Sequence, residues 1–245
     1  MLFKTATREK NTPFMLRLLW KTYYLLQKIL PAGFLLKMLL NTVWALWRLS
    51  WEQTNVYEKR HETEGKVDIL RPRNVSDAVA GVSASQRVCD FGGGAGDIST
   101  AFLKLGCNVV YADTNPALEA NMLKRFGHLP NFKVANSYEV ADGREGEFDL
   151  IVMSHVLEHI EDPRSFLEKL GKTTQRIHIE VPDLAAEPLS YIRVKLGLPV
   201  YKDDDHIIEM SLEYLKKLIE DSNYTVETIV SRDAALVARA KSNAI

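Results

Sequence analysis

The chain has 245 residues and a formal net charge of −1, and 46% of its residues are hydrophobic. This length can hold one α/β domain of ordinary size with an appendage. The two cysteines, Cys89 and Cys107, lie in or beside predicted core strands and lack metal-ligand spacing, so they argue against a disulfide framework and indicate a reduced, cytosolic setting.

The near-zero net charge conceals a division of the chain. Residues 1–51 carry eight Lys or Arg against Glu9 alone, a net of 8 − 1 = +7, so residues 52–245 must carry −1 − 7 = −8. Residues 1–51 therefore form a separate basic segment, which also holds all four tryptophans, Trp20, Trp44, Trp47 and Trp51.

Within this segment the spacing predicts two amphipathic helices, over residues 13–30 and 34–51, that form a hairpin around Pro31. Lys21 and Lys28 are seven residues apart and therefore share one helical stripe, beside a broad apolar face. The longest uncharged stretch of the segment has ten residues, which is well short of the roughly 20 that cross a bilayer.

Two interpretations of the hairpin stay open. Residues 13–51 can lie on an anionic membrane surface, with lysines at the headgroups and tryptophans at the boundary, or they can pack on the catalytic domain as a substrate lid. The absence of any acid from Lys10 to Trp51 favours the membrane. No nucleic-acid partner is expected, because a large apolar surface dilutes the basic residues.

Residues 52–85 are predicted to be a connecting segment with short helices, and from residue 86 apolar strands alternate with helices. This alternation predicts an α/β domain over 86–245 with a doubly wound, mostly parallel sheet. Strands are expected at 86–90, 108–112, 132–135, 148–154, 176–181, 225–230 and 234–240, and helices at 96–105, 116–126, 163–170 and 211–222.

A glycine-rich turn follows the first of these strands. Asp90 ends the strand, and Gly92, Gly94 and Gly96 follow at alternating positions before a helix. A strand, a glycine turn and a helix N-terminus bind nucleotides, because glycine allows positive φ and close approach of a ligand to the main chain. The spacing differs from the dinucleotide motif G-x-G-x-x-G, and an acid at the strand end suits a ligand with an amino group better than one with phosphates.

The second strand ends on Asp113, seventeen residues after Gly96 (113 − 96). In doubly wound folds a carboxylate at this place accepts hydrogen bonds from ribose hydroxyls. An amino group and a ribose without phosphate describe S-adenosylmethionine as the cofactor.

On these residues, and on the run F-D-L-I-V-M-S-H-V-L-E-H-I-E-D-P at 148–163, the sequence resembles the class I S-adenosylmethionine-dependent methyltransferases over roughly 86–230. The run is similar to the subgroup that includes quinone-biosynthesis O-methyltransferases and methyltransferases of natural-product and polysaccharide pathways. The resemblance implies a seven-stranded sheet whose final strand is antiparallel, and a cofactor lying across the carboxyl ends of the first strands.

The resemblance also implies further cofactor contacts. Thr114 would lie near the adenine, and Asn136 would meet the adenine edge, although the acid common in relatives is missing there. Ser154 and His155, at the end of the fourth strand, would face the methionine half of the cofactor.

The turn after the fourth strand spells H-x-x-E-H at residues 155–159, a pattern found in one class of zinc peptidases. A peptidase is excluded, because the motif follows a buried strand and Pro163 soon ends it. In quinone O-methyltransferases the similar E-V-x-E-H turn can hold a divalent ion, with His155 here replacing the first acid. For Glu158 and His159 a metal site, acid–base catalysis by His159 and a structural role stay open, and we assign no metal.

Residues 182–210 are expected to be the substrate insert, and within them His206 is the second candidate base. The sequence thus predicts a methyltransferase that methylates a hydroxyl of a small-molecule or lipid-linked acceptor, in the cytosol or on the inner face of the membrane. A soluble sugar or metabolite methyltransferase, and a non-catalytic partner subunit with the same fold, are the alternatives.

Overall fold

The computed structural model describes residues 14–61, 74–143, 147–186, 188–198, 200 and 205–245. The chain divides into two compact units, Met1–Val67 and Asp68–Ile245. Part of the predicted connection, residues 62–73, lies outside the described residues.

The N-terminal unit consists of two helices, α1 (Phe14–Ile29) and α2 (Ala32–His61). They are separated at Pro31, whose missing N–H prevents the first helix from continuing. α2 continues ten residues beyond the predicted end at Trp51, because neither Gly nor Pro occurs between Gly33 and Gly65. None of the described helices combines the length and the apolar character that crossing a membrane requires.

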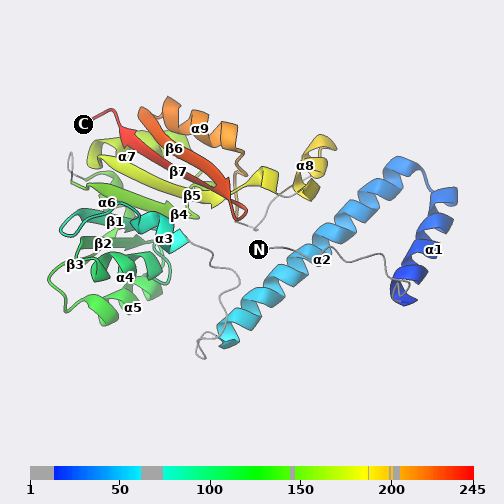
Figure 1. Ribbon diagram of the computed structural model, residues 1–245, viewed down its shortest axis with the longest axis horizontal. Helices are drawn as coiled ribbons and strands as arrows, with labels where there is room; N and C mark the ends of the chain where they lie inside the picture. The colour runs from blue at the N-terminus through cyan, green and yellow to red at the C-terminus, as the bar shows by residue number, and fades with distance from the viewer. Residues whose placement is uncertain (1–13, 62–73, 144–146, 187, 199, 201–204) are drawn as a thin grey trace. The chain divides into compact units, whose positions relative to one another are not determined.

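The C-terminal unit is built on a seven-stranded sheet with the order β3-β2-β1-β4-β5-β7-β6, shown in Figure 1. β1 to β5 are parallel, whereas β7 runs antiparallel to both β5 and β6. This confirms the predicted doubly wound sheet and its antiparallel final strand. The strands are β1 (Arg87–Phe91), β2 (Asn108–Asp113), β3 (Phe132–Asn136), β4 (Leu150–Ser154), β5 (Arg176–Pro182), β6 (Tyr224–Arg232) and β7 (Ala235–Ser242).

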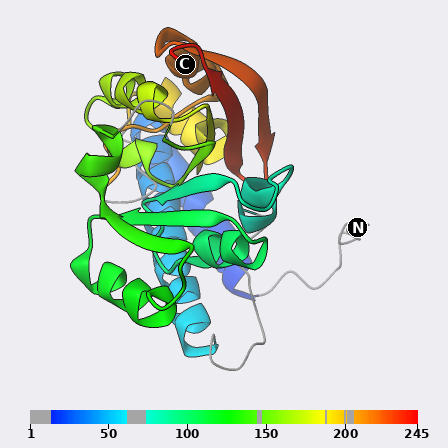
Figure 2. The same cartoon turned by 90° about the vertical axis from the view of Figure 1, so that its left-hand side faces the viewer.

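Helices cover both faces of this sheet, as Figure 2 shows from the side. α3 (Asn74–Val79), α4 (Asp97–Lys104) and α5 (Pro116–Phe126) lie on one face, and α6 (Ser137–Ala141), α7 (Pro163–Thr173) and α9 (Leu212–Asp221) on the other. The remaining helical segments are η2 (Leu157–His159), η3 (Leu184–Ala186) and α8 (Pro188–Lys195).

Side chains that point alternately to the two faces of the sheet form a hydrophobic core on each face. In β4, Ile151 and Met153 belong to the cluster under α7 and α9, whereas Leu150 and Val152 belong to the cluster under α4 and α5. Successive side chains of a strand point to opposite faces, so a continuous apolar run is what a sheet covered on both sides requires.

The helices that lead away from the strand ends are capped by their own sequence. The Asn115 side chain accepts a hydrogen bond at the start of α5, and Asp162 does so at the start of α7, each followed directly by a proline. Ser211 caps α9 in the same way. Capping side chains and first-turn prolines fix where a helix begins, so the loops at the carboxyl ends of the strands have defined lengths.

The register of the parallel strands gathers the predicted site residues at one edge. Asp113 at the end of β2 lies beside Asn136 of β3, and Ser154 at the end of β4 lies beside Glu180 of β5. The strand order reverses next to β1, which is the topological switch point where doubly wound sheets bind ligands.

Arg239 of β7 joins the sheet to α3. Its Nη1 donates to the Ala80 carbonyl at 2.6 Å and its Nη2 to the Asp77 carbonyl at 2.6 Å. The Asp77 carbonyl also accepts from the Ala80 N–H at 3.3 Å, and the guanidinium adds shorter, charge-assisted bonds at this end of α3 that suit the helix dipole. We expect Arg239→Met to lower the free energy of unfolding by about 3 kcal/mol in urea titrations, because two charge-assisted hydrogen bonds are lost.

The matched control is Arg176→Met, which removes a partly exposed ion pair with Glu227 at 3.1 Å. Exposed pairs contribute about 0–1 kcal/mol. Equal destabilisation by the two substitutions would contradict the assigned role of Arg239.

Candidate active site

The glycine turn after β1 has the backbone conformation that its glycines allow. Gly92, Gly94 and Gly96 have φ angles of 70°, 51° and 81°, in the region that disfavours side chains. At Gly92 a β-carbon would also lie 2.5 Å from Cγ2 of Val156. The turn therefore needs glycine at position 92 for conformation and for space.

The turn is tied to the neighbouring strand β2. The Gly92 N–H donates to the Ala112 carbonyl at 2.7 Å, and the Tyr111 hydroxyl donates to the Gly94 carbonyl at 2.7 Å. Tyr111 is fully buried, and burial raises the pKa of its hydroxyl well above the ordinary value, so it stays protonated and able to donate. These bonds hold the turn in shape before any ligand binds.

Asp90 lies at the bottom of this turn and is 2% exposed. Its Oδ2 accepts hydrogen bonds from the Ser99 N–H at 2.9 Å and from the Ser99 hydroxyl at 2.6 Å, in the first turn of α4. Burial outweighs these hydrogen bonds and raises the pKa of the Asp90 carboxyl to about 6. A buried carboxylate of this kind attracts a positively charged group, such as the amino group that the sequence analysis assigned to it.

Asp113 lies across the same turn. Its Oδ2 accepts from the Gly94 N–H at 3.0 Å and its Oδ1 from the Asn115 N–H at 2.9 Å, and its side chain is half-buried. Thr114 and Asn136 are exposed nearby, Asn136 at the end of β3. The structure thus brings Asp113, Asn136 and the glycine turn together, and the assigned cofactor contacts stay predictions.

His155 follows the half-buried Ser154 at the end of β4 and has a positive φ of 56°. Its Nδ1 lies 3.3 Å from Glu158 Oε1 and its Nε2 lies 3.8 Å from Glu180 Oε1. Burial lowers the pKa of this imidazole, but Glu158 and Glu180 outweigh burial and raise the pKa to about 9. The two carboxylates thus favour the protonated form of His155, a pairing that its sequence position alone does not indicate.

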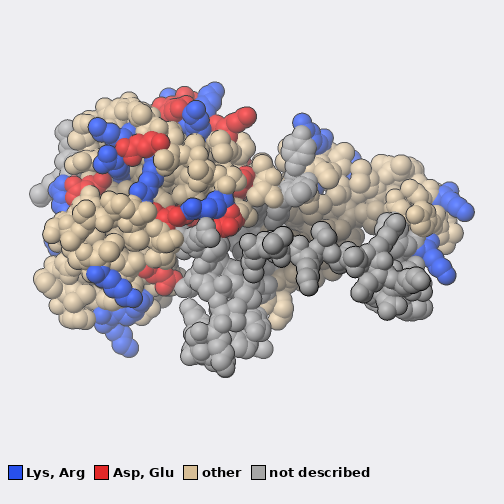
Figure 3. All heavy atoms as spheres, in the orientation of Figure 1, with Lys and Arg blue, Asp and Glu red and all other residues tan. Residues whose placement is uncertain are grey.

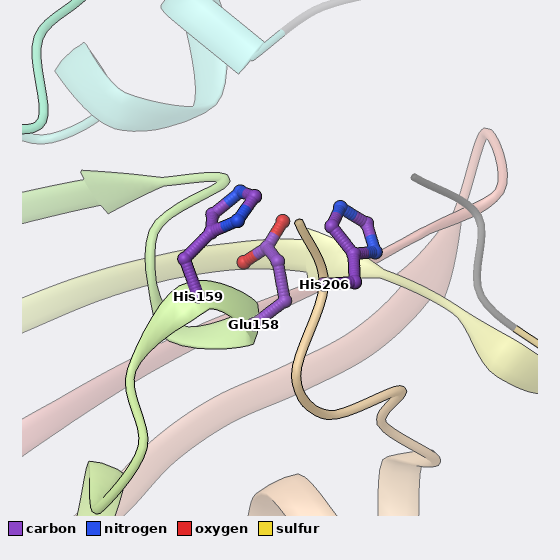
Figure 4. A group of neighbouring side chains, drawn as sticks. All are labelled: Glu158, His159 and His206. Carbon is purple, nitrogen blue, oxygen red and sulfur yellow. The ribbon is translucent and has the colours of Figure 1, made fainter. Parts of the chain in front are cut away.

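A second group of side chains gathers beside it. Glu158 and His159 of η2 and His206 of the insert each offer a ligand atom, and these atoms lie within 4.8 Å of one another. Figure 4 shows the Glu158 carboxylate between the two imidazole rings. Glu158 is 1% exposed; its Oε1 lies 3.3 Å from His155 Nδ1, and its Oε2 has no hydrogen-bond partner among the described residues.

Partners on the outer side orient the two histidines of this group. His206 Nδ1 lies 2.9 Å from Glu209 Oε1, and both side chains are buried. His159 Nδ1 lies 3.2 Å from the Asp205 carbonyl oxygen. A donor role for each Nδ1 leaves each Nε2 as the acceptor, which suits a base or a metal ligand equally.

One carboxylate and two imidazoles with outer partners are a donor set that suits a divalent cation. The sequence alone assigns no metal here and leaves the role of Glu158 and His159 open. Sequence reasoning missed Glu209, although it stands three residues after His206, because it lies in an insert without a recognisable motif.

Residues of the predicted insert also line a shallow apolar depression that is open to solvent. Glu209 alone is charged among the described residues that line the depression, which are Leu184, Val194, Leu198, Val200, Ile207, Ile208 and Glu209.

Comparison with known proteins assigns the chain to a family. The methyltransferase domain family matches residues 60–229. The ubiquinone biosynthesis O-methyltransferase of Aromatoleum aromaticum is 32% identical over 118 residues, 47% of this chain and 48% of that protein. The match thus spans about half the length of that relative.

Solved structures share the fold at low sequence identity. The 1,6-didemethyltoxoflavin N1-methyltransferase of Burkholderia thailandensis, solved with that substrate and S-adenosylhomocysteine, has a TM-score of 0.55 and 18% identity, covering 82% of this chain and 89% of its own. The magnesium protoporphyrin IX methyltransferase of Synechocystis, solved with S-adenosylhomocysteine, has a TM-score of 0.56 and 16% identity, covering 81% and 99%. With its motif-bearing residues inside the matched range, the chain belongs to the methyltransferase domain family.

Proposed function

We propose that this methyltransferase uses S-adenosylmethionine to methylate a hydroxyl of a small-molecule or lipid-linked acceptor. The observation that carries the proposal is the preformed glycine turn with a buried carboxylate, Asp90, below it and a second carboxylate, Asp113, across it. The similarity to a protein named as a ubiquinone biosynthesis O-methyltransferase supports oxygen as the methylated atom.

The donor would be held by its charged and hydroxyl groups. Asp113 accepts hydrogen bonds from the ribose hydroxyls, and Asp90 faces the positive amino group. Ser154 and His155 are assigned to the methionine half, where the protonated His155 offers positive charge to the carboxylate. The methyl group is already activated by the positive sulfur, so the protein must align the acceptor and remove its proton.

His206 is the base in this proposal, and Glu209 positions it. Nδ1–H of His206 donates to Glu209, so the Nε2 lone pair takes the proton from the acceptor hydroxyl. The S–CH₃ bond breaks as the O–CH₃ bond forms, leaving S-adenosylhomocysteine and a methyl ether. The Glu209 carboxylate stabilises the imidazolium that results, and His159 lies beside it with ring centroids 4.9 Å apart.

Glu158 Oε2, which has no hydrogen-bond partner among the described residues, favours a second candidate for the activation step. A divalent cation held by Glu158, His159 and His206 would polarise the acceptor hydroxyl in place of the base. A chelator distinguishes the two. Turnover by a base persists in its presence, whereas a cation mechanism loses turnover and recovers it when Mg²⁺ or Zn²⁺ is added back.

The test starts from consumption of labelled S-adenosylmethionine with the aqueous and the lipid fraction of a cell extract. We expect product in at least one fraction, and the fraction separates a soluble from a lipid-linked acceptor. No consumption with either fraction, despite binding of S-adenosylhomocysteine, would instead support the non-catalytic partner subunit.

On the acceptor so identified, we expect His206→Gln to lower kcat about a hundredfold, because the acceptor hydroxyl loses its base. Glu209→Gln should lower kcat less, and Glu209→Asp should restore part of the loss, while affinity for S-adenosylhomocysteine stays unchanged. Glu213→Gln, an exposed acid in the first turn of α9, is the matched control. Wild-type kcat in His206→Gln would exclude His206 as the base.

We also propose that the enzyme meets its acceptor on the cytosolic surface of a membrane. The support is the N-terminal unit, whose basic charge and exposed apolar side chains suit such a surface.

A further inference from the structure

α2 exposes an apolar stripe along one of its sides. Leu36, Leu39, Val43 and Leu46 follow one another at intervals of three, four and three residues, and are between 37% and 58% exposed. Side chains at these intervals lie above one another on a helix, so the stripe is continuous.

α1 adds apolar side chains directly beside positive charge. Leu25 and Ile29 are 59% and 68% exposed. Leu25 stands four residues after the exposed Lys21, and Ile29 follows the exposed Lys28. Exposed large apolar side chains that gather on one segment in this way mark a binding surface.

The polar groups on the same side of α2 are satisfied inside the helix. The Thr42 hydroxyl donates to the Met38 carbonyl at 2.9 Å, and the Ser50 hydroxyl donates to the Leu46 carbonyl at 3.0 Å. A hydroxyl in an exposed position loses nothing by bonding to water, whereas in an apolar medium this internal bond is the way to satisfy it. The stripe can therefore enter a hydrocarbon environment without leaving these donors unpaired.

The charge of the N-terminal unit indicates whether the stripe binds a lipid surface or a second copy of the chain. Between Glu9 and Glu52 the sequence has no acidic residue, and Lys21, Lys28 and Lys37 are exposed. Figure 3 shows the described part of this unit as largely uncharged, with Lys and Arg but no Asp or Glu on the face in view. Two such surfaces repel each other, whereas anionic headgroups complement them.

We propose that α1 and the first part of α2, to Ser50, form an anchor that lies in the plane of an anionic lipid surface. The apolar stripe enters the acyl region, the lysines reach the headgroups, and the stacked Trp44 and Trp47, with ring centroids 5.3 Å apart, lie at the boundary between them. This inference rests on the membrane location proposed above and on none of the catalytic assignments.

The test is co-sedimentation with vesicles of phosphatidylcholine alone and of phosphatidylcholine mixed with phosphatidylglycerol. The full-length chain should pellet with both and more strongly with phosphatidylglycerol, and added salt should remove the difference. The double variant Leu39→Glu/Leu46→Glu should bind the vesicles at least about tenfold more weakly, because two large side chains can no longer be buried. Leu123→Glu, at a position on α5 that is 51% exposed, is the matched control and should bind as wild type.

A second pair of variants tests charge without touching the stripe. Lys21→Gln/Lys28→Gln should lose about tenfold or more in affinity for the phosphatidylglycerol vesicles only. This pair keeps the proposal testable if the glutamate variant loses helicity in circular dichroism. Pelleting of both variants at the wild-type level would overturn the proposal, as would a lipid-free dimer that binds no vesicles and dissociates in the stripe variant.

Affinity for S-adenosylhomocysteine and methyl transfer are measured on the same proteins. Weak vesicle binding with normal methyl transfer in a variant supports the anchor. Absence of vesicle binding in a wild-type chain that transfers methyl groups overturns the anchor and leaves the chemistry standing. Strong vesicle binding by a chain that consumes no S-adenosylmethionine overturns the chemistry and leaves the anchor standing.

Discussion

Replacing Asp113 with alanine is expected to weaken binding of S-adenosylhomocysteine about a thousandfold, which isothermal titration calorimetry would measure. The Asp113 carboxylate faces the glycine turn at the carboxyl end of β2, where it can accept a hydrogen bond from each ribose hydroxyl. Hydrogen bonds to a charged group contribute roughly 2 kcal/mol each, and two of them correspond to about three powers of ten in affinity.

Two further variants show whether a loss of affinity comes from the Asp113 carboxylate itself. Asp142→Ala removes an exposed carboxylate that follows α6 and pairs with Lys169 at 3.7 Å, and this variant should bind as wild type. Asp113→Asn preserves the shape of the side chain but replaces one acceptor with a donor, which would face either the Gly94 or the Asn115 N–H, so it should also bind weakly. If Asp113→Ala folded normally and kept wild-type affinity, the assignment of this carboxylate to the ribose would be wrong.

The fold follows from local patterns in the sequence. Apolar runs such as that of β4 alternate with helices whose starts are marked by capping residues and prolines, as at Asn115 and Asp162. The glycine turn was likewise predictable, because positive φ is a property of the residues themselves. Patterns of this kind need no knowledge of distant contacts.

The electrostatic partners of the site were not predictable in the same way. Glu180 reaches His155 only because the register of β4 and β5 places Ser154 beside it, and a sequence does not state its register. Ser99 meets Asp90 because α4 begins with its first turn above the end of β1. In each case the sequence identifies one residue, but the partner that sets the pKa of this residue comes from a neighbouring element, whose position the sequence does not state.

The N-terminal helices are also predicted only in part by the sequence. Charge spacing predicts both helices, but the change to a polar composition after Trp51 predicts an end that α2 does not have, since it continues to His61. Composition changes the environment of a helix without ending it, since termination needs a breaker or a cap. The internal hydroxyl bonds of Thr42 and Ser50 likewise became visible only in the structure.

Asp90→Asn is expected to stabilise the fold while weakening the proposed cofactor site. Burial raises the pKa of the Asp90 carboxyl from 3.8 to about 6, so between these values the native state binds more protons than the unfolded state. Stability therefore falls as pH rises through this window, and the ionised carboxylate costs about 3 kcal/mol at pH 7. Asparagine keeps an acceptor for Ser99 without the charge, so urea titrations should show a gain of up to about 3 kcal/mol at pH 7 that disappears below about pH 4.

We expect the same Asp90→Asn variant to bind S-adenosylhomocysteine more weakly. In the wild type the ionised Asp90 faces the positive amino group of S-adenosylhomocysteine, so affinity should fall as pH drops below about 6, where the carboxylate becomes protonated. The Asn variant has no charge to lose, and its weaker affinity should stay constant over the same range. Ser99→Ala, which removes the hydroxyl donor but keeps the carboxylate, should retain the pH dependence. A less stable Asn variant at pH 7 would contradict the cost assigned to the buried charge. An Asn variant that keeps both the affinity and its pH dependence would show that Asp90 does not face the cofactor.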